Sequence, residues 1–208
     1  MGISERKLKD KEKIRGKILH AAMKLFVKEG YENVSMRKIS QKIEYSPGTI
    51  YLHFKDKESM LFELHKIAFD KFYEALSASN TEPDPLNRLY KMGENYLNFA
   101  FENPEYYDLM FINNCVADSI ENSESWVGHN SFELLKQNIA DCAKQGFINP
   151  QDIDVAAFSM WTFVHGIASL AIKKRLTGVP EEYLNHTIFG SLKFLTNLLN
   201  IKKSKQTK

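Results

Sequence analysis

Two short helical patterns lie close together near the start of the chain, and the second begins with Ser-Pro-Gly at residues 46–48. Serine is a favoured N-cap, and proline is tolerated at the first helical position because its missing N–H would have no partner there. We therefore expect a helix over 36–43 and a second helix that begins at Pro47 and ends near His53. Two short helices joined by a turn of three to four residues form a helix-turn-helix.

Helical periodicity also dominates the rest of the chain, and patterns typical of strands are nearly absent. The fold class expected is all-α, with about nine helices: an N-terminal three-helix domain followed by a C-terminal helical bundle. A lysine-rich, frayed tail is expected at the end. The other helices are predicted over residues 11–28, Lys57 to about Ser79, 86–101, 104–115, 125–144, 153–176 and 181–200.

Charge divides the chain into unlike parts. Residues 1–60 hold 14 Lys and Arg against 8 Asp and Glu, whereas residues 61–201 hold 10 against 18, although the net charge is only +2. A basic module on an acidic body is typical of a phosphate-binding domain attached to a domain that does not bind phosphate, although a solvated lysine-rich helix face gives the same count. We expect a helix-turn-helix domain over 1–62, a second domain over 63–201 and a basic tail over 202–208.

Composition argues against several other classes of protein. Cys115 and Cys142 lack the spacing of a zinc site or a disulfide framework and fit a reducing cytosol. No apolar run approaches the ~18 residues of a membrane span, so a cytoplasmic protein with no membrane partner is expected. Catalytic motifs with elbow glycines, a Walker-type loop or HExxH do not occur, and the histidines are scattered. We expect no enzyme activity, no cofactor and no metal site.

The first turn of the second short helix suits the major groove of DNA. A recognition helix enters the groove by its N-terminal end, which must be narrow and able to hydrogen bond. Pro47 and Gly48 keep this end narrow, and Thr49 offers a hydroxyl and a methyl group to base edges. Tyr51 and His53 lie on other sides of the helix, where they can reach phosphate oxygens.

The segment SMRKISQKIEYSPGTIYLHFKDKESML, residues 35–61, and the preceding ILHAAMKLFVKEGYENVS resemble the DNA-binding domain of the TetR family of transcriptional repressors. The resemblance covers about residues 11–62. It implies that the two segments around 36–43 and 47–53 position the protein on DNA and read its bases. The residues implied to contact DNA are Ser35, Arg37, Tyr45, Ser46, Pro47, Gly48, Thr49, Tyr51, His53 and Lys57.

One position departs from the family pattern. The family usually has glycine in the turn where this chain has Glu44, followed here by Tyr45. A residue other than glycine either accepts some strain at such a turn or adopts a slightly different turn geometry. The fold is therefore better determined by the sequence than the tilt of the recognition helix.

Aromatic residues are dense in the second half of the chain. MWTFVHGIASL, residues 160–170, resembles the Trp-His-Gly signature of one class of TetR-type C-terminal domains, and FENPEYYDLMF, residues 101–111, resembles the segment that precedes it. Such a bundle can hold an apolar pocket with a few polar anchors, although aromatic stripes on helices more often form core. His165 is either a ligand contact or a satisfied core histidine. The candidate pocket residues are Tyr96, Phe99, Tyr107, Met110, Phe111, Trp126, Trp161 and His165.

The helices near 153–176 and 181–200 carry apolar residues over a wider arc than one neighbour covers, which suggests an oligomer face. In the family, these helices pair with a second copy. The resemblance implies a homodimer that binds a pseudo-palindromic operator in double-stranded DNA and is released by an unknown small apolar or aromatic effector. The expected function is a ligand-responsive transcriptional regulator, a repressor. The alternatives are a DNA-binding adaptor controlled by a protein partner and, less favoured, an enzyme with a tethered DNA-binding domain.

Overall fold

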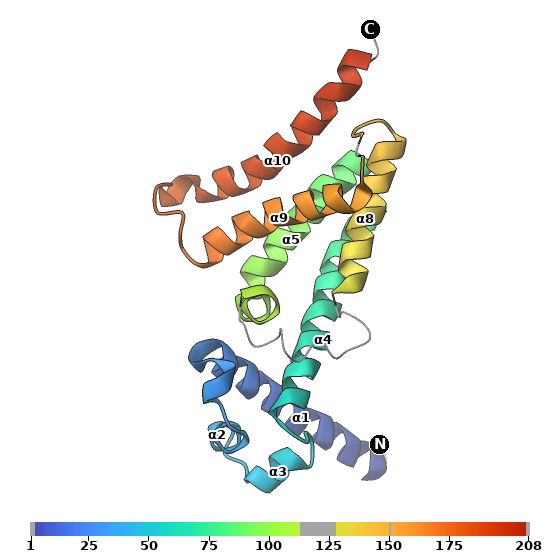
Figure 1. The fold of residues 1–208 in the computed structure, drawn as a ribbon. Coiled ribbons are helices and arrows are strands. Elements are labelled where there is room, and N and C mark those ends of the chain that lie inside the picture. Colours follow the sequence, from blue (N-terminus) through green and yellow to red (C-terminus); the bar gives the residue numbers. More distant parts are fainter. Residues whose placement is uncertain (1–2, 113–127, 150, 207–208) are drawn as a thin grey trace. The chain divides into compact units, whose positions relative to one another are not determined.

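The computed structural model describes residues 3–112, 128–149 and 151–206, and within these ranges the chain has nine α-helices and no strand (Figure 1). The all-α prediction is confirmed. The described chain forms two compact units. The first contains the residues up to Ala68 together with residues 105–112, and the second contains residues 69–104 and the described residues from 128 onward.

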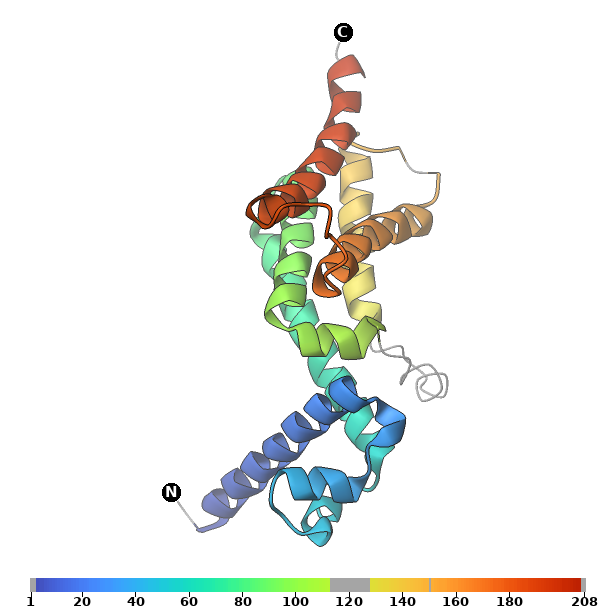
Figure 2. The ribbon, with the colours of Figure 1, turned by 90° about the vertical axis from the view of Figure 1, so that its left-hand side faces the viewer.

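The first unit contains α1 (Ile3–Glu29), α2 (Met36–Lys42), α3 (Pro47–Tyr51) and the beginning of α4 (Lys57–Ser77) (Figures 1 and 2). A short 3-10 helix, Tyr31–Asn33, connects α1 to α2. Apolar side chains from all four α-helices form one core, so that each short helix is held by burial as well as by its own hydrogen bonds. Its fully buried members include Ile18, Phe26, Ile39, Ile50 and Met60.

Side-chain caps fix where the two short helices begin. Ser35 Oγ accepts a hydrogen bond from the N–H of Lys38 at 3.2 Å, and Ser46 Oγ accepts one from the N–H of Thr49 at 3.2 Å. These bonds satisfy N–H groups that have no partner within the helix. Pro47 is the first residue of α3, as predicted.

Glu44 adopts a left-handed conformation in the turn between α2 and α3, with φ 59°. Tyr45 N–H donates to the Ser40 carbonyl at 3.0 Å, and Glu44 N–H donates to the Gln41 carbonyl at 3.3 Å. This is the pattern of a Schellman motif, whose left-handed residue is usually glycine. For a residue that has a Cβ, the left-handed conformation costs about 1–2 kcal/mol of folding free energy. Of the two expected alternatives, the chain keeps the turn geometry and accepts the strain.

The second unit is organised around α5 (Pro85–Glu102), which packs against α8 (His129–Lys144), α9 (Ile153–Ile172) and α10 (Glu181–Gln206). A 3-10 helix, Ala78–Thr81, links α4 to α5. Gly93 allows α5 and α10 to approach closely, because a Cβ at this position would lie 3.2 Å from Leu192. One core cluster of this unit contains Leu86, Leu89, Ile139, Cys142, Phe147 and Ala157.

The chain returns to the first unit after α5. The short helix α6 (Pro104–Tyr107) leads into a π-helical turn, Asp108–Ile112, and Leu109 is fully buried in the core of the first unit. His65 of α4 is 1% exposed, and burial lowers its pKa to about 4, opposed by a hydrogen bond with the backbone of Leu109. His65 is therefore a neutral core residue at pH 7.

Several helix ends differ from the sequence expectations. α1 begins at Ile3 rather than Lys11, because the preceding residues favour helix without adding to a core. α9 ends at Ile172 rather than 176, because Lys174 takes a left-handed conformation with φ 52°. The tail expected to fray continues α10 as far as Gln206.

The predicted helix over 104–115 divides into α6 and the π-helical turn within its described part, and residues 113–115 lie outside the described residues. The helix predicted from 125 is described from His129 onward. α9 is long and apolar enough to cross a membrane by length and composition alone, with a mean hydropathy of 1.6 over its most apolar window. The contiguous apolar runs considered in the sequence did not reveal this, since polar residues such as Ser159 and His165 interrupt them.

The strained turn yields a prediction about stability. Replacing Glu44→Gly removes the Cβ from the left-handed position and is expected to raise the free energy of unfolding by about 1 kcal/mol, after the larger backbone entropy of glycine is offset. Glu44→Ala is the matched control, since it also removes the carboxylate but keeps the Cβ. Urea unfolding of both variants measures the difference. Equal midpoints for the two variants would show that the turn is not strained.

Candidate nucleic-acid interface and aromatic core

One side of α3 is anchored in the first unit and the other lies at the surface. Ile50 and Phe54 are buried, whereas Tyr51 is 57% exposed. Pro47 and Gly48, in the first turn of α3, are also exposed. Pro47 and Gly48, both predicted to meet bases, therefore lie on the outside of a helix that is fixed from within, and Thr49 beside them is half-buried.

Leu52 is a surface residue that does not belong to the predicted DNA contacts. It is the C-cap of α3 and is 78% exposed, the largest exposed fraction among the large apolar side chains of the described residues. Its position directly after Tyr51 places an apolar side chain beside the candidate DNA contacts. Periodicity treats a leucine as a core residue, so only the structure reveals this exposure.

The hydroxyl of Thr49 is held by its neighbour. Ser46 Oγ and Thr49 Oγ1 lie 2.9 Å apart in a hydrogen bond. Ser46 therefore fixes both the backbone and the side chain of Thr49. The methyl group of Thr49 is then the part of the side chain without a role inside the helix, which suits contact with an apolar group such as a thymine methyl.

Lys57 contributes to the fold as well as to the surface charge. Its Nζ donates to the Tyr31 carbonyl at 2.7 Å and lies 3.9 Å from the centroid of the Tyr31 ring. These contacts connect the first turn of α4 to the 3-10 helix after α1. An ammonium has three donors, so the side chain can hold this carbonyl and still contact a phosphate oxygen.

The candidate contacts outside α3 have different environments. Ser35 is engaged as the N-cap of α2, and Arg37 is exposed in the first turn of that helix. Tyr45 is half-buried, with Lys17 Nζ 5.9 Å from its ring centroid. The structure thus brings one basic residue of α1, Lys17, to the turn that precedes α3.

His53 lies in a basic environment after α3. Burial, followed by the positive charges of Lys11 and Arg15, lowers the pKa of His53 below its usual value, while Glu12 acts in the opposite direction. The imidazole is then neutral at pH 7, so that one ring nitrogen can donate a hydrogen bond but the ring does not act as a cation.

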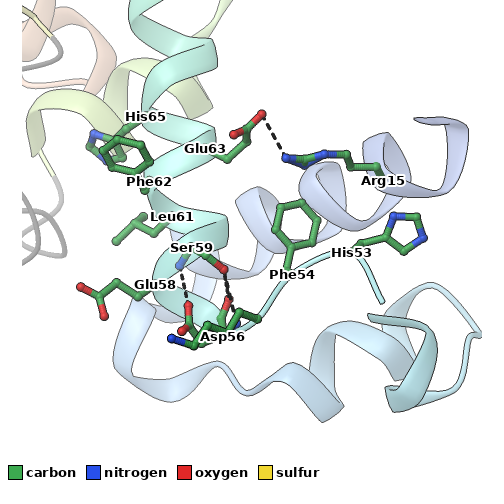
Figure 3. Close-up of a pocket in the computed structure, with 11 residues that line it drawn as sticks. Arg15, His53, Phe54, Asp56, Glu58, Ser59, Leu61, Phe62, Glu63 and His65 are labelled. Atoms are coloured by element: carbon green, nitrogen blue, oxygen red, sulfur yellow. Dashed lines mark hydrogen bonds and ion pairs between the residues drawn. The ribbon is translucent and has the colours of Figure 1, made fainter. Parts of the chain in front are cut away.

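A pocket of about 540 Å³ lies beside His53, between α1 and the beginning of α4 (Figure 3). Ser59 N–H donates to Asp56 Oδ1 at 2.8 Å, which caps α4, and Arg15 Nη2 lies 3.3 Å from Glu63 Oε1. Most of the charged side chains that line this pocket in Figure 3 therefore already have partners that hold the first unit together. Among the described residues, no group of three or more His, Cys, Asp or Glu side chains could hold a metal ion.

Several predicted pocket residues meet in the second unit. Tyr96 Oη lies 3.0 Å from His165 Nδ1, and Trp161 lies 5.8 Å from the His165 ring by centroids. Tyr96 and Phe99 each pack edge-on against Phe72, with centroids 5.1 Å apart. Burial lowers the pKa of His165, so this is a neutral aromatic cluster with a phenol and an imidazole inside it.

The other predicted pocket residues lie elsewhere. Tyr107, Met110 and Phe111 belong to the first unit, where the Tyr107 and Phe111 rings lie 5.2 Å apart by centroids. Trp126 lies outside the described residues. The structure therefore does not assemble the whole predicted set in one unit.

An apolar face covers the outer sides of α9 and α10. Only a small part of the membrane-length stretch in α9, 17%, is buried within the chain. The face also contains Gly166 and Gly190, where an added Cβ would meet no described atom within 4 Å. Its exposed large side chains are Val155, Phe158, Leu170, Tyr183, Phe194 and Leu198.

Comparison with known proteins gives two family matches along the chain. Residues 18–64 match the family described as bacterial regulatory proteins, tetR family, and residues 89–188 match the tetracyclin repressor-like, C-terminal domain. The uncharacterized HTH-type transcriptional regulator YobS of Bacillus subtilis (strain 168) is 27% identical over 88% of this chain and 91% of its own length. The HTH-type regulator YuxN of the same organism is 30% identical over 40% of this chain, which spans only 28% of that protein.

Solved structures show the same fold. The fatty acid degradation regulator FadR from Bacillus halodurans has a TM-score of 0.71 at 17% identity, over 89% of this chain and 94% of that one. The TetR family transcriptional regulator PfmR from Thermus thermophilus has a TM-score of 0.63 at 22% identity, over 73% of this chain and 84% of that one. At these identities the likeness concerns the fold alone.

Proposed function

This chain belongs to the TetR family of DNA-binding transcriptional regulators, and from that premise we propose that it is a repressor that binds a pseudo-palindromic operator as a homodimer and is released by a small apolar or aromatic effector. Members of the family are regulators and not enzymes. The observation that carries the proposal is the capped helix α3, whose first turn is exposed while Ile50 holds it from within. We place its action in the cytoplasm, where double-stranded DNA is accessible.

The DNA contacts follow from the two sides of α3. Pro47, Gly48 and Thr49 enter the major groove, with the Thr49 methyl against a base. Tyr51 and His53 hold phosphate oxygens by neutral hydrogen bonds. The remaining contacts position the helix on the backbone and comprise Ser35, Arg37, Tyr45, Ser46 and Lys57.

Two substitutions separate base reading from phosphate binding. Tyr51→Phe removes only the hydroxyl and is expected to weaken binding to all duplexes alike, by about 1 kcal/mol. Thr49→Ser removes the methyl group and is expected to change the preferred base at one position of each half-site. The probe is a duplex selected by the wild-type protein from a random-sequence pool, with its single-base variants, in a competition assay.

Tyr73→Phe provides the control for Tyr51→Phe, because Tyr73 is another exposed tyrosine, on the part of α4 that belongs to the second unit. It should leave DNA affinity unchanged. If Tyr51 and Thr49 can both be replaced without any effect on affinity or base preference, α3 is not the recognition helix.

Dimerisation follows from the apolar face of α9 and α10. Exposing this many large apolar side chains to water is unfavourable, and a second copy of the same face covers them by two-fold symmetry. Thr162, Gly166 and Gly190 are small residues within the face and permit close approach of helices. Such a dimer sets two recognition helices about one DNA turn apart, roughly 34–36 Å.

Phe194→Glu tests the dimer, since it places a charge at the centre of the proposed face on α10 and should convert the protein to monomer. Asn185→Glu adds the same charge on the opposite, exposed side of this helix and should leave the dimer intact. Sedimentation velocity at micromolar concentration measures both. A dimeric Phe194→Glu variant would exclude α10 from the interface.

The effector is proposed to bind at the aromatic cluster around Tyr96 and His165. An apolar ligand gains from burial against Phe72, Phe99 and Trp161, and the phenol and imidazole supply the polar anchor. The candidates Tyr107, Met110, Phe111 and Trp126 stay predictions from the sequence and are not needed for this proposal. α4 is the proposed coupling element, since its first part belongs to the first unit and its last part to the second.

Release of DNA by the effector is proposed to be a population shift between two conformers of the protein. Moving the protein from mostly bound to mostly released requires the effector to prefer one conformer by about 5.5 kcal/mol. A panel of aromatic and acyl compounds, titrated against the protein–duplex complex, is expected to contain at least one that releases DNA. Tyr96→Phe should then shift the releasing concentration without changing DNA affinity in the absence of compound. If compounds bind the protein and leave DNA affinity unchanged, control by a protein partner replaces this mechanism.

A further inference from the structure

The helix α1 continues well beyond the core of the first unit. Ile18 is fully buried and Ile14 is packed against the core, whereas every side chain from Ser4 to Lys13 is exposed. The stretch from Ile3 to Lys13 is about 16 Å long at 1.5 Å per residue. It therefore projects from the unit as a helix that no described residue covers.

This free end of α1, residues 3–13, lies at the same end of the first unit as the recognition helix. Figures 1 and 2, which are related by a quarter turn, both show α1 descending to the level of α3. Contacts agree with this placement. Arg15 lies 4.5 Å from the centroid of the Phe54 ring, just after α3, and Lys17 lies over Tyr45, just before it. DNA seated on α3 thus passes close to the free end.

Basic residues line one side of the free end. Lys7, Lys11 and Arg15 follow one another at intervals of four and share a helix face. Ile14 and Ile18 extend the same side into the core, so this row faces the side of α1 on which the helix-turn-helix packs. Lys9 and Lys13 lie on the opposite side. The acidic residues of the stretch fall on other rows and are Glu5, Asp10 and Glu12.

Two nitrogen atoms, one in Arg15 of this row and one in the nearby His53, lack partners within the described chain. Arg15 Nη1 and His53 Nδ1 are both buried atoms with no hydrogen-bond acceptor or donor among the described residues. Both residues line the pocket in Figure 3. A buried guanidinium donor normally has a partner, and an anionic oxygen is the strongest acceptor for it.

We propose that the free end of α1 is a second DNA-binding element, in which Lys7 and Lys11 hold phosphates beside the groove that α3 enters. It rests on the proposed function, because it takes α3 as the recognition helix. Lysines on a projecting helix are often merely solvated, and such lysines contribute little whichever side they occupy. A DNA-binding element, in contrast to a solvated helix, requires that only one side of α1 contacts DNA.

The two sides of α1 supply a matched pair of variants. Lys7→Gln with Lys11→Gln removes two charges from the proposed binding side, and Lys9→Gln with Lys13→Gln removes two from the other side. All four residues are exposed, so thermal unfolding should be unchanged in both. The dissociation constant for a duplex selected by the wild-type protein is measured over a series of salt concentrations.

The binding-side variant is expected to reduce the slope of log affinity against log salt by about 0.9 for each phosphate that is no longer neutralised, or about 2 per protomer. At 0.1 M salt its affinity should fall by about tenfold per lysine. The control variant should keep the wild-type slope, and the preferred bases should be the same in all three proteins, since phosphate contacts carry no sequence information.

Equal slopes for the two variants would overturn the inference and leave the proposed function intact. A changed base preference in the binding-side variant would also overturn it, because the lysines would then read bases. Failure of the wild-type protein to select any duplex would overturn the proposed function and this inference together.

Discussion

The position of α3, the proposed recognition helix, depends on the burial of Ile50 and Phe54. A five-residue helix is far too short to be stable alone in water, since forming its first turn fixes several residues for one hydrogen bond. Its position therefore comes from these two side chains in the core and from the Ser46 cap at its beginning. Because both constraints act on the inner side and the end of α3, its outer side is left free of structural roles. The residues there are available for DNA while the helix stays fixed.

In the second unit, by contrast, a large apolar surface remains exposed. α5 is packed against three helices, whereas α9 and α10 each keep large apolar side chains exposed along one side of the helix. A monomer with this face would be prone to non-specific association. The glycines within it have no internal packing role, since nothing of the described chain lies near their Cβ positions. The proposed closure by a second copy would account for both features and would link the geometry of two α3 helices to one interface.

Local signals explain which elements the sequence could predict. The beginnings of α2 and α3 follow from Ser35 and Ser46, because a cap acts on the next three residues whatever the rest of the fold does. The start of α1 escapes prediction, since residues 3–13 face no core and show no apolar stripe. The end of α9 escapes it because Lys174 ends the helix where a glycine would have marked it. The burial of Leu109 in the first unit is a tertiary contact that no local pattern encodes.

The DNA-contact residues were predicted by resemblance, whereas the exposure of Leu52 and the partners of Thr49 and Lys57 required the structure.

The positive charge of the first quarter of the chain has two separate uses. Lys57 on the Tyr31 carbonyl, Arg15 beside Glu63 and Lys38 paired with Glu29 join one helix of the first unit to another. Such partly exposed pairs add only a little stability each, but they fix where elements meet. The carboxylates partly neutralise the charges of Arg15 and Lys38, which then contribute less to a field that attracts DNA, whereas Lys57 on a carbonyl keeps its full charge. The field must then come from the exposed residues, which the charge count alone cannot distinguish from the paired ones. The charge available to the proposed DNA-binding surface thus depends on which basic side chains lack a carboxylate partner, not on how many the sequence contains.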